Sequence, residues 1–218
     1  MYQRLAARAS AYPLADLALP IKQAIVDAVE AAWREVLSVS SQFANENDAT
    51  TMLVEALRSV RSQGSIPLFS EYYFQTPVRD ACETNFSGAA PSKRPDIHLR
   101  LINAVDDYEG WFIECKVVDR RHPVQLYVQQ GINRYVTGEY AWAMPSALMI
   151  AYASDGFTIA TNLAAALPAS SQPQPSGLRT TADAGRTIHC RNFMYLGPGG
   201  APGNIELVHL WLSGGTVV

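Results

Sequence analysis

One short run constrains the fold of this chain more than any other stretch: Trp111-Phe112-Ile113-Glu114-Cys115-Lys116-Val117-Val118. It is apolar apart from Glu114 and Lys116, which is typical of a strand that is buried on both faces. Side chains alternate between the two faces of a strand, so these two charged groups point the same way. Burial of charged groups is costly unless they are paired. The run therefore predicts a central strand that carries a polar site on one face.

A second strand is predicted just before this run, over Arg94-Pro95-Asp96-Ile97-His98-Leu99-Arg100-Leu101. The polar, glycine-closed turn Val105–Gly110 separates the two strands, so we expect an antiparallel hairpin. Asp96 stands at the start of the first strand, where it can approach Glu114. The letters alone leave the pairing register open, and a shift by one residue would turn a strand over.

Two carboxylates and an ammonium group on one face of a hairpin suit phosphodiester cleavage. Asp96 and Glu114 offer the hard oxygen ligands that Mg²⁺ or Mn²⁺ prefers, with positions left for water and a phosphate oxygen. Lys116 adds a positive charge that can steady an attacking hydroxide or the charge on the phosphate. The alternative is a hairpin in which Glu-x-Lys occurs by chance. Two charges within an otherwise apolar strand favour the catalytic interpretation.

At Pro95-Asp96 and Glu114-Cys115-Lys116 the chain resembles the PD-(D/E)xK nuclease superfamily, which has the restriction-endonuclease-like fold. The resemblance implies that Asp96 and Glu114 bind the metal, Mg²⁺ or Mn²⁺, and that Lys116 assists the water. It also implies an acidic residue on a helix ahead of the sheet.

Such a helix is predicted over Asn45–Leu57, where apolar residues recur at intervals of three and four. Glu46 lies in its first turn and is the candidate fourth catalytic residue and third metal ligand. An acidic residue at this position also favours the helix dipole, which is the alternative explanation. Glu55 and Glu71 are further candidates for the same role.

The helix predicted after the motif, over Val124–Val136, begins next to Pro123. Gln130 and Arg134 lie four residues apart in it and share a face. The resemblance implies that this helix lies beside the active site and offers side chains to the substrate, so both are candidate substrate-binding residues. A solvated position for Gln130 and a surface ion pair for Arg134 are the alternatives. The Gln-x-x-x-Tyr pattern of some family members is not met.

The net charge of −3 excludes a broadly basic nucleic-acid-binding protein, but local charge matters more than the sum. Arg94 is therefore a candidate substrate-binding residue, within basic residues that cluster in sequence around the site: Lys93, Arg94, Arg100, Lys116, Arg120, Arg121 and Arg134. In the tail, His189 and Arg191 share a predicted strand face and are candidate phosphate-binding residues. An edge strand with polar residues facing water is the alternative for this pair.

The remaining pattern predicts an α/β protein with a restriction-endonuclease-like core: a mixed central β-sheet flanked by helices, with an N-terminal helical layer. At 218 residues we expect a single domain over 1–218, with a helical region over 1–63 and a sheet-containing core over 64–218. Residues 1 to about 40 are expected to be largely helical, including an amphipathic run from Ile21 to Trp33. The later elements are a strand over Pro145–Ala153, a helix over Phe157–Leu167, a spacer over Pro168–Gly177 and a closing hairpin of Thr187–Phe193 with Ile205–Leu212.

No apolar segment approaches the roughly 20 residues of a membrane span, and the start lacks a secretory signal, so a soluble cytoplasmic protein is expected. Cys82, Cys115 and Cys190 are unclustered, which fits a reducing compartment and gives no zinc pattern. The sequence thus predicts a metal-dependent endonuclease that acts on nucleic acid, with DNA favoured over RNA, in phage defence, restriction or repair. A homodimer or a partner subunit is the expected source of specificity. A non-catalytic interaction subunit of the same fold is the alternative.

Overall fold

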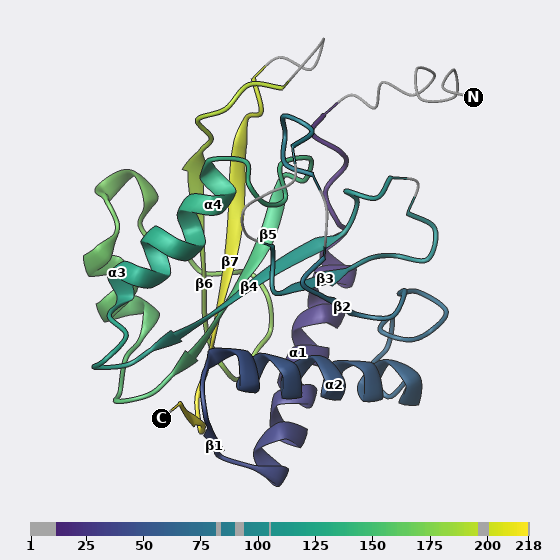
Figure 1. Ribbon diagram of the computed structural model, residues 1–218, viewed down its shortest axis with the longest axis vertical. Helices are drawn as coiled ribbons and strands as arrows, with labels where there is room; N and C mark the ends of the chain where they lie inside the picture. The colour runs from purple at the N-terminus through teal and green to yellow at the C-terminus, as the bar shows by residue number, and fades with distance from the viewer. Residues whose placement is uncertain (1–11, 82–83, 90–93, 105, 196–200, 218) are drawn as a thin grey trace.

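A six-stranded mixed sheet forms the centre of the computed structural model, which describes residues 12–81, 84–89, 94–104, 106–195 and 201–217 (Figure 1). The strands lie in the order β2-β3-β4-β5-β7-β6. β4, β5 and β7 are parallel, whereas β2, β3 and β6 run antiparallel to their neighbours. Their bounds are Val78–Arg79 (β2), Ile97–Leu99 (β3), Trp111–Val118 (β4), Ser146–Ala153 (β5), Asp183–Cys190 (β6) and Asn204–Leu212 (β7).

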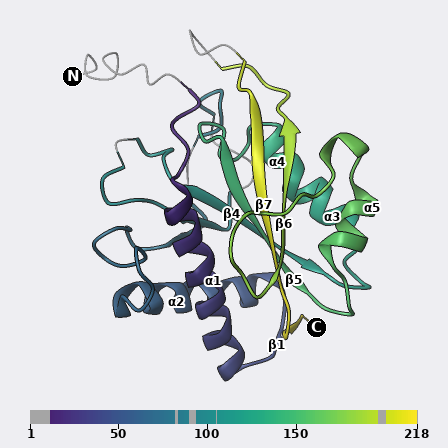
Figure 2. The same ribbon diagram turned by 180° about the vertical axis from the view of Figure 1, so that it is seen from behind.

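Helices cover both faces of this sheet. On one face lie α1 (Leu19–Val39) and α2 (Glu46–Gln63), which cross each other; Figure 2 shows α1 in front of the sheet. On the other face, one continuous helix consists of α3 (Val124–Tyr127), a π-helical turn (Val128–Ile132) and α4 (Asn133–Val136). The prediction of an α/β protein with a mixed sheet flanked by helices is confirmed.

Complete burial explains why the central strands read as apolar runs. Every residue of β4 and of β5 is buried. The ring of Trp33 in α1 stacks on Tyr152 of β5 at 5.1 Å, whereas Tyr127 of α3 packs edge-on against Trp211 of β7 from the opposite face. α1, α2 and the sheet share one hydrophobic core. No helix among the described residues is long and apolar enough to span a membrane.

Some predicted boundaries are wrong. α1 begins only at Leu19, where Pro20 occupies the first turn, so residues 12–18 are not helical; residues 1–11 lie outside the described residues. The start of α2 agrees with its prediction, because Asn45 caps it through a bond from the Asp48 amide. Its end does not, because the helix continues past Leu57 to Gln63, where Gly64 ends it in the left-handed conformation at φ +61°.

The predicted spacer over 168–177 is ordered. It holds a 3₁₀ turn over Ala169–Ser171 and a bridge between Gln174 and Arg186. The preceding helix is short, with a π-helical turn over Ile159–Leu163 followed by α5 (Ala164–Ala166). The tail hairpin is confirmed as β6 and β7, but β6 ends at Cys190 rather than at the predicted Phe193, so Arg191 lies outside the strand. Of these two strands β6 lies at an edge of the sheet, and β7 lies inside it beside β5. A separate parallel pair joins β1 (Gln42–Phe43) to β8 (Thr216–Val217).

Candidate active site

Cross-strand pairing brings three carboxylates into one row. β3 pairs with β4 through Ile97 and Ile113, so Asp96, one residue before β3, lies opposite Glu114. The predicted hairpin and the approach of its two carboxylates are therefore confirmed. β2 pairs with β3 in the register that places Asp80 beside Asp96, and the Asp80 amide donates to the Asp96 carbonyl at 3.3 Å. Asp80 was missed in the sequence because β2 is too short to leave an alternating pattern.

The outer edge of β4 positions two of the acidic side chains. β3 pairs only with Trp111 to Ile113 of β4, so the next outward amides of β4 have no strand to donate to. The Cys115 amide donates instead to Asp96 Oδ2 at 2.7 Å, and the Val117 amide donates to Glu46 Oε2 at 3.0 Å. Glu46 is the first residue of α2, so the start of that helix is fixed against the strand. The structure therefore brings Glu46 to the predicted site.

The ammonium group of Lys116 lies at the centre of the carboxylates. Its Nζ is 2.8 Å from Glu46 Oε1, 2.9 Å from Glu114 Oε1 and 4.0 Å from Asp96 Oδ2. It also donates to the Cys115 carbonyl at 2.7 Å. Burial disfavours the charged amine, but the surrounding carboxylates, Glu114 foremost, outweigh burial and raise the pKa of Lys116 above its ordinary value.

Glu114 is the most deeply buried charged group of the site, with 1% of its surface exposed. Its Oε1 accepts from Lys116 and from Arg134 Nη1 at 2.5 Å, whereas its buried Oε2 accepts no hydrogen bond from any described residue. Burial, and then repulsion by Asp96, raise the pKa of Glu114 to about 8 despite the two cations. Burial also raises the pKa of Asp96, partly offset by Lys116 and by the Cys115 amide.

Arg134 lies in α4, and the loop that follows α4 helps to hold its side chain against Glu114. Its Nη1 donates to the Tyr140 hydroxyl at 3.0 Å, and that hydroxyl donates to the Arg94 carbonyl at 2.7 Å. The Arg134 guanidinium also lies 5.5 Å from the centre of the Tyr140 ring. Tyr140 was missed because it lies in a loop whose path no local pattern indicates. The π-helical turn that precedes Arg134 is a feature often found at functional sites.

These side chains line an open cleft of about 520 Å³. Gln130 and Arg94 are exposed at its rim. Four carboxylates and three cationic groups face the cleft, so its lining has no excess of positive charge. The full lining is Glu46, Asn47, Asp80, Arg94, Asp96, Glu114, Lys116, Gln130 and Arg134.

Two predicted phosphate-binding residues lie elsewhere, and their contacts contradict that role. His189 is buried and bonds to Thr187, which in turn bonds to His209, each at 2.7 Å. Burial lowers the pKa of His189 to about 4, so it carries no charge to offer a phosphate at neutral pH. The Arg191 guanidinium donates to three backbone carbonyls of the loop before β5, at Ala141, Trp142 and Met144.

The further acidic candidates lie outside the cleft. Glu55 pairs with Arg58 at 2.6 Å, and Glu71 pairs with Arg61 at 3.4 Å. Neither lines the cleft, so Glu46 is the acidic residue that the helix supplies.

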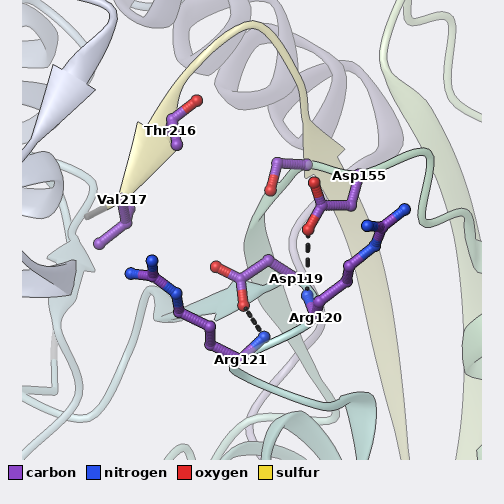
Figure 3. Close-up of a pocket in the computed structure, with 7 residues that line it drawn as sticks. Asp119, Arg120, Arg121, Asp155, Thr216 and Val217 are labelled. Atoms are coloured by element: carbon purple, nitrogen blue, oxygen red, sulfur yellow. Dashed lines mark hydrogen bonds between the residues drawn. The ribbon is translucent and has the colours of Figure 1, made fainter.

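The basic residues that cluster in sequence are divided in space. Arg120 and Arg121 lie in a second hollow of about 280 Å³ beyond the end of β4, where Figure 3 shows Arg121 extending toward Val217 of β8. Their backbone amides are held there by Asp155 and Asp119 respectively. Arg100 pairs with Asp107. Lys93 and Cys82 lie outside the described residues, as does Val105, the first residue of the predicted turn.

The donor set suits a hard divalent cation, but it is engaged with Lys116. Glu46, Asp96 and Glu114 supply carboxylate oxygens from three separate elements, and Glu114 Oε2 is a buried acceptor without a hydrogen bond from the described part of the chain. As they stand, no three acidic, histidine or cysteine side chains within the described ranges converge closely enough to hold a metal ion. The chemistry of the residues therefore fits a metal, whereas their present arrangement fits the ammonium group.

Comparison with protein families, with curated proteins and with solved structures finds no match to this chain.

Proposed function

We propose that this protein is a metal-dependent nuclease with a restriction-endonuclease-like core, and that it hydrolyses phosphodiester bonds, with DNA as the favoured substrate. The observation that carries the proposal is the meeting of Glu46, Asp96, Glu114 and Lys116 in one cleft. They come from the first turn of a helix ahead of the sheet, the residue before β3 and the middle of β4. This is the placement that the resemblance to PD-(D/E)xK nucleases implies.

Asp96, Glu114 and Glu46 would hold Mg²⁺ or Mn²⁺ in this cleft. The ion would supply a water of lowered pKa and an electrophile for the phosphate oxygens. The lining supports a cation, because four acidic side chains against three basic ones leave no excess of positive charge to attract a polyanion.

The cationic and amide groups of the chain divide the remaining tasks. Lys116 is the group placed to orient the attacking water and to stabilise negative charge on the phosphate. Arg94 and Gln130, exposed at the rim, are placed to bind the backbone of the nucleic acid on either side of the scissile bond. Arg134 holds Glu114 in position through its 2.5 Å contact. With so few basic groups at the rim, sequence specificity would come from a second copy or a partner subunit, in restriction, phage defence or repair.

A non-catalytic interaction subunit of the same fold is the second candidate. It is favoured by the structural contacts that the acidic groups already make. Asp96 and Glu46 accept hydrogen bonds from β4 amides, and both carboxylates lie next to the Lys116 ammonium group. A site kept only for such contacts would bind no metal. Metal binding therefore separates the two candidates.

The test is incubation of the purified protein with supercoiled plasmid, linear duplex, single-stranded DNA and RNA, in Mg²⁺, Mn²⁺ or EDTA. Glu114→Gln is the site variant. Glu55→Gln is its matched control, because Glu55 is an exposed glutamate outside the cleft. Cleavage that requires metal, persists in Glu55→Gln and disappears in Glu114→Gln supports the proposal. Equal cleavage by both variants contradicts it, and an absence of both cleavage and metal binding favours the interaction subunit.

A further inference from the structure

We infer that the ammonium group of Lys116 acts as a built-in cation, which fills the centre of the carboxylate group and is displaced when a divalent cation binds. This inference rests on the proposed function. It adds a role for Lys116 before any substrate arrives: the lysine holds the metal-free site together, and metal binding releases its side chain.

The contacts of Nζ are those of a bound cation. Three oxygen atoms lie within 2.9 Å of it, from the side chains of Glu46 and Glu114 and from the Cys115 carbonyl. A fourth, Asp96 Oδ2, lies 4.0 Å away. These carboxylates are the same groups that a metal would use. One oxygen cannot be fully engaged by the ammonium group and the metal at once, so the two cations compete.

Electrostatics makes this competition strong. The Lys116 residue is only 9% exposed, so little water is available to screen a second cation placed beside it. Repulsion between a divalent ion and an ammonium group a few ångströms apart is several-fold larger in such a site than in bulk water. Conversely, removal of both cations would leave the acidic side chains of Glu46, Asp96 and Glu114 facing one another without a counter-charge. The site therefore needs one cation, and Lys116 supplies it in the absence of metal.

The surroundings give the lysine side chain room to leave. Lys116 lines the open cleft rather than a closed cavity, and its four-carbon stem is flexible. On the side of the π-helical turn its neighbour is Gly131, which has no side chain; even a Cβ there would lie 3.8 Å from Lys116 Cγ. A displaced ammonium group would point into the cleft, where the substrate phosphate binds in the proposed function.

The first experiment measures Mn²⁺ affinity by titration calorimetry in wild-type protein, in Lys116→Met and in Lys22→Met. Lys22 is a matched control because it is also buried and paired with two carboxylates, at 2.7 Å to Asp16 and 3.4 Å to Glu206, and it does not line the cleft. Loss of the competing charge should tighten Mn²⁺ binding at least about tenfold in Lys116→Met and leave it unchanged in Lys22→Met. Equal or weaker binding by Lys116→Met, or no binding by any of the three proteins, overturns the inference.

A second measurement uses wild-type protein alone and decides the matter if Lys116→Met does not fold. The chain has three lysines, Lys22, Lys93 and Lys116, so acetylation by an amine-reactive ester can be followed at each by mass spectrometry. Saturating Mn²⁺ should increase the labelling of Lys116 several-fold while that of Lys22 stays constant. Unchanged or reduced labelling of Lys116 contradicts displacement. Neither readout depends on cleavage, so displacement without cleavage would fault only the proposed function, and cleavage without displacement only this inference.

Discussion

The stability of the metal-free protein should fall as the pH rises above 6.5, because of Glu114. This carboxyl group is 1% exposed, and its pKa is raised from 4.5 to about 8 by burial and by Asp96. Between these two pKa values the folded protein holds a proton at Glu114 that the unfolded chain has released. The free energy of unfolding therefore decreases with rising pH, and the stabilising contribution is lost once the pH exceeds about 8.

The size of the effect follows from the pH interval between 6.5 and the raised pKa of Glu114. One group contributes about 1.4 kcal/mol per pH unit, so the interval from pH 6.5 to 8 amounts to about 2 kcal/mol. Below pH 6.5 two buried histidines act in the opposite direction, because burial lowers the pKa of His189 to about 4 and that of His209 to about 3. Their unfolded forms bind protons there, so stability rises with pH up to 6.5. The unfolded histidines are half neutral at pH 6.5, so this opposing contribution shrinks above that pH and is nearly gone by about pH 7.5.

Urea unfolding in EDTA, followed by circular dichroism at half-unit steps from pH 6.5 to 9, measures the effect. Wild-type protein should lose about 2 kcal/mol, whereas Glu114→Gln should be nearly flat and more stable than wild type at pH 9. Glu55→Gln should keep the wild-type slope, because Glu55 is exposed beside Arg58. A flat wild-type profile, or an unchanged slope in Glu114→Gln, would show that Lys116 and Arg134 keep Glu114 ionised throughout, and the reasoning would be refuted.

Three further predictions test the site and its supports. Asp96→Asn should abolish metal-dependent plasmid cleavage while keeping the urea midpoint near wild type, because the amide oxygen still accepts the β4 hydrogen bond; cleavage at the wild-type rate would remove Asp96 from the site. Thr187→Val should cost about 2 to 4 kcal/mol in urea unfolding, because two buried imidazole nitrogens lose their partner, and a loss below about 0.5 kcal/mol would show that they find another. Gly131→Ala should cost about 1 kcal/mol by urea unfolding, since its Cβ would lie 2.4 Å from Met149 Cε, the end of a buried but flexible side chain; a smaller cost of Gly131→Ala in the Met149→Ala background would assign the cost to that contact, and an equal cost in both backgrounds would contradict it.

Local patterns in the sequence predict the elements whose form depends on residues close together in the chain. The buried strand β4 follows from an uninterrupted apolar run, because helices cover both faces of the parallel strands. The start of α2 follows from the asparagine cap and the apolar stripe, and with it the place of Glu46. The hairpin follows from its polar turn. These features bring Asp96 toward Glu114 and Lys116. The place of Glu46 beside them is an expectation from the resemblance to PD-(D/E)xK nucleases, because no local pattern packs α2 against β4.

The wrong predictions concern residues whose burial depends on which distant segment of the chain packs over them. Alternation correctly assigns a face to His189 but does not say whether that face meets water. In the structure Tyr127 of α3 packs over the neighbouring strand and bonds to His209, which makes His189 part of a buried chain. Arg191 likewise donates to carbonyls about fifty residues away in the chain. Tyr140 belongs to the same loop and reaches the site only because that loop is held in place.

The unequal lengths of β3 and β4 explain why a polar site can exist within so apolar a sheet. If β3 extended back past Ile97, its backbone would accept the amides of Cys115 and Val117, and no acidic side chain would be required there. Because it starts at Ile97, the carboxylates of Asp96 and Glu46 take those hydrogen bonds and are fixed at the edge of β4. Their negative charge beside the buried Glu114 then requires a cation, which Lys116 provides from the same strand. The geometry that stabilises a free strand edge thus also gathers the carboxylates to which the proposed function assigns the metal.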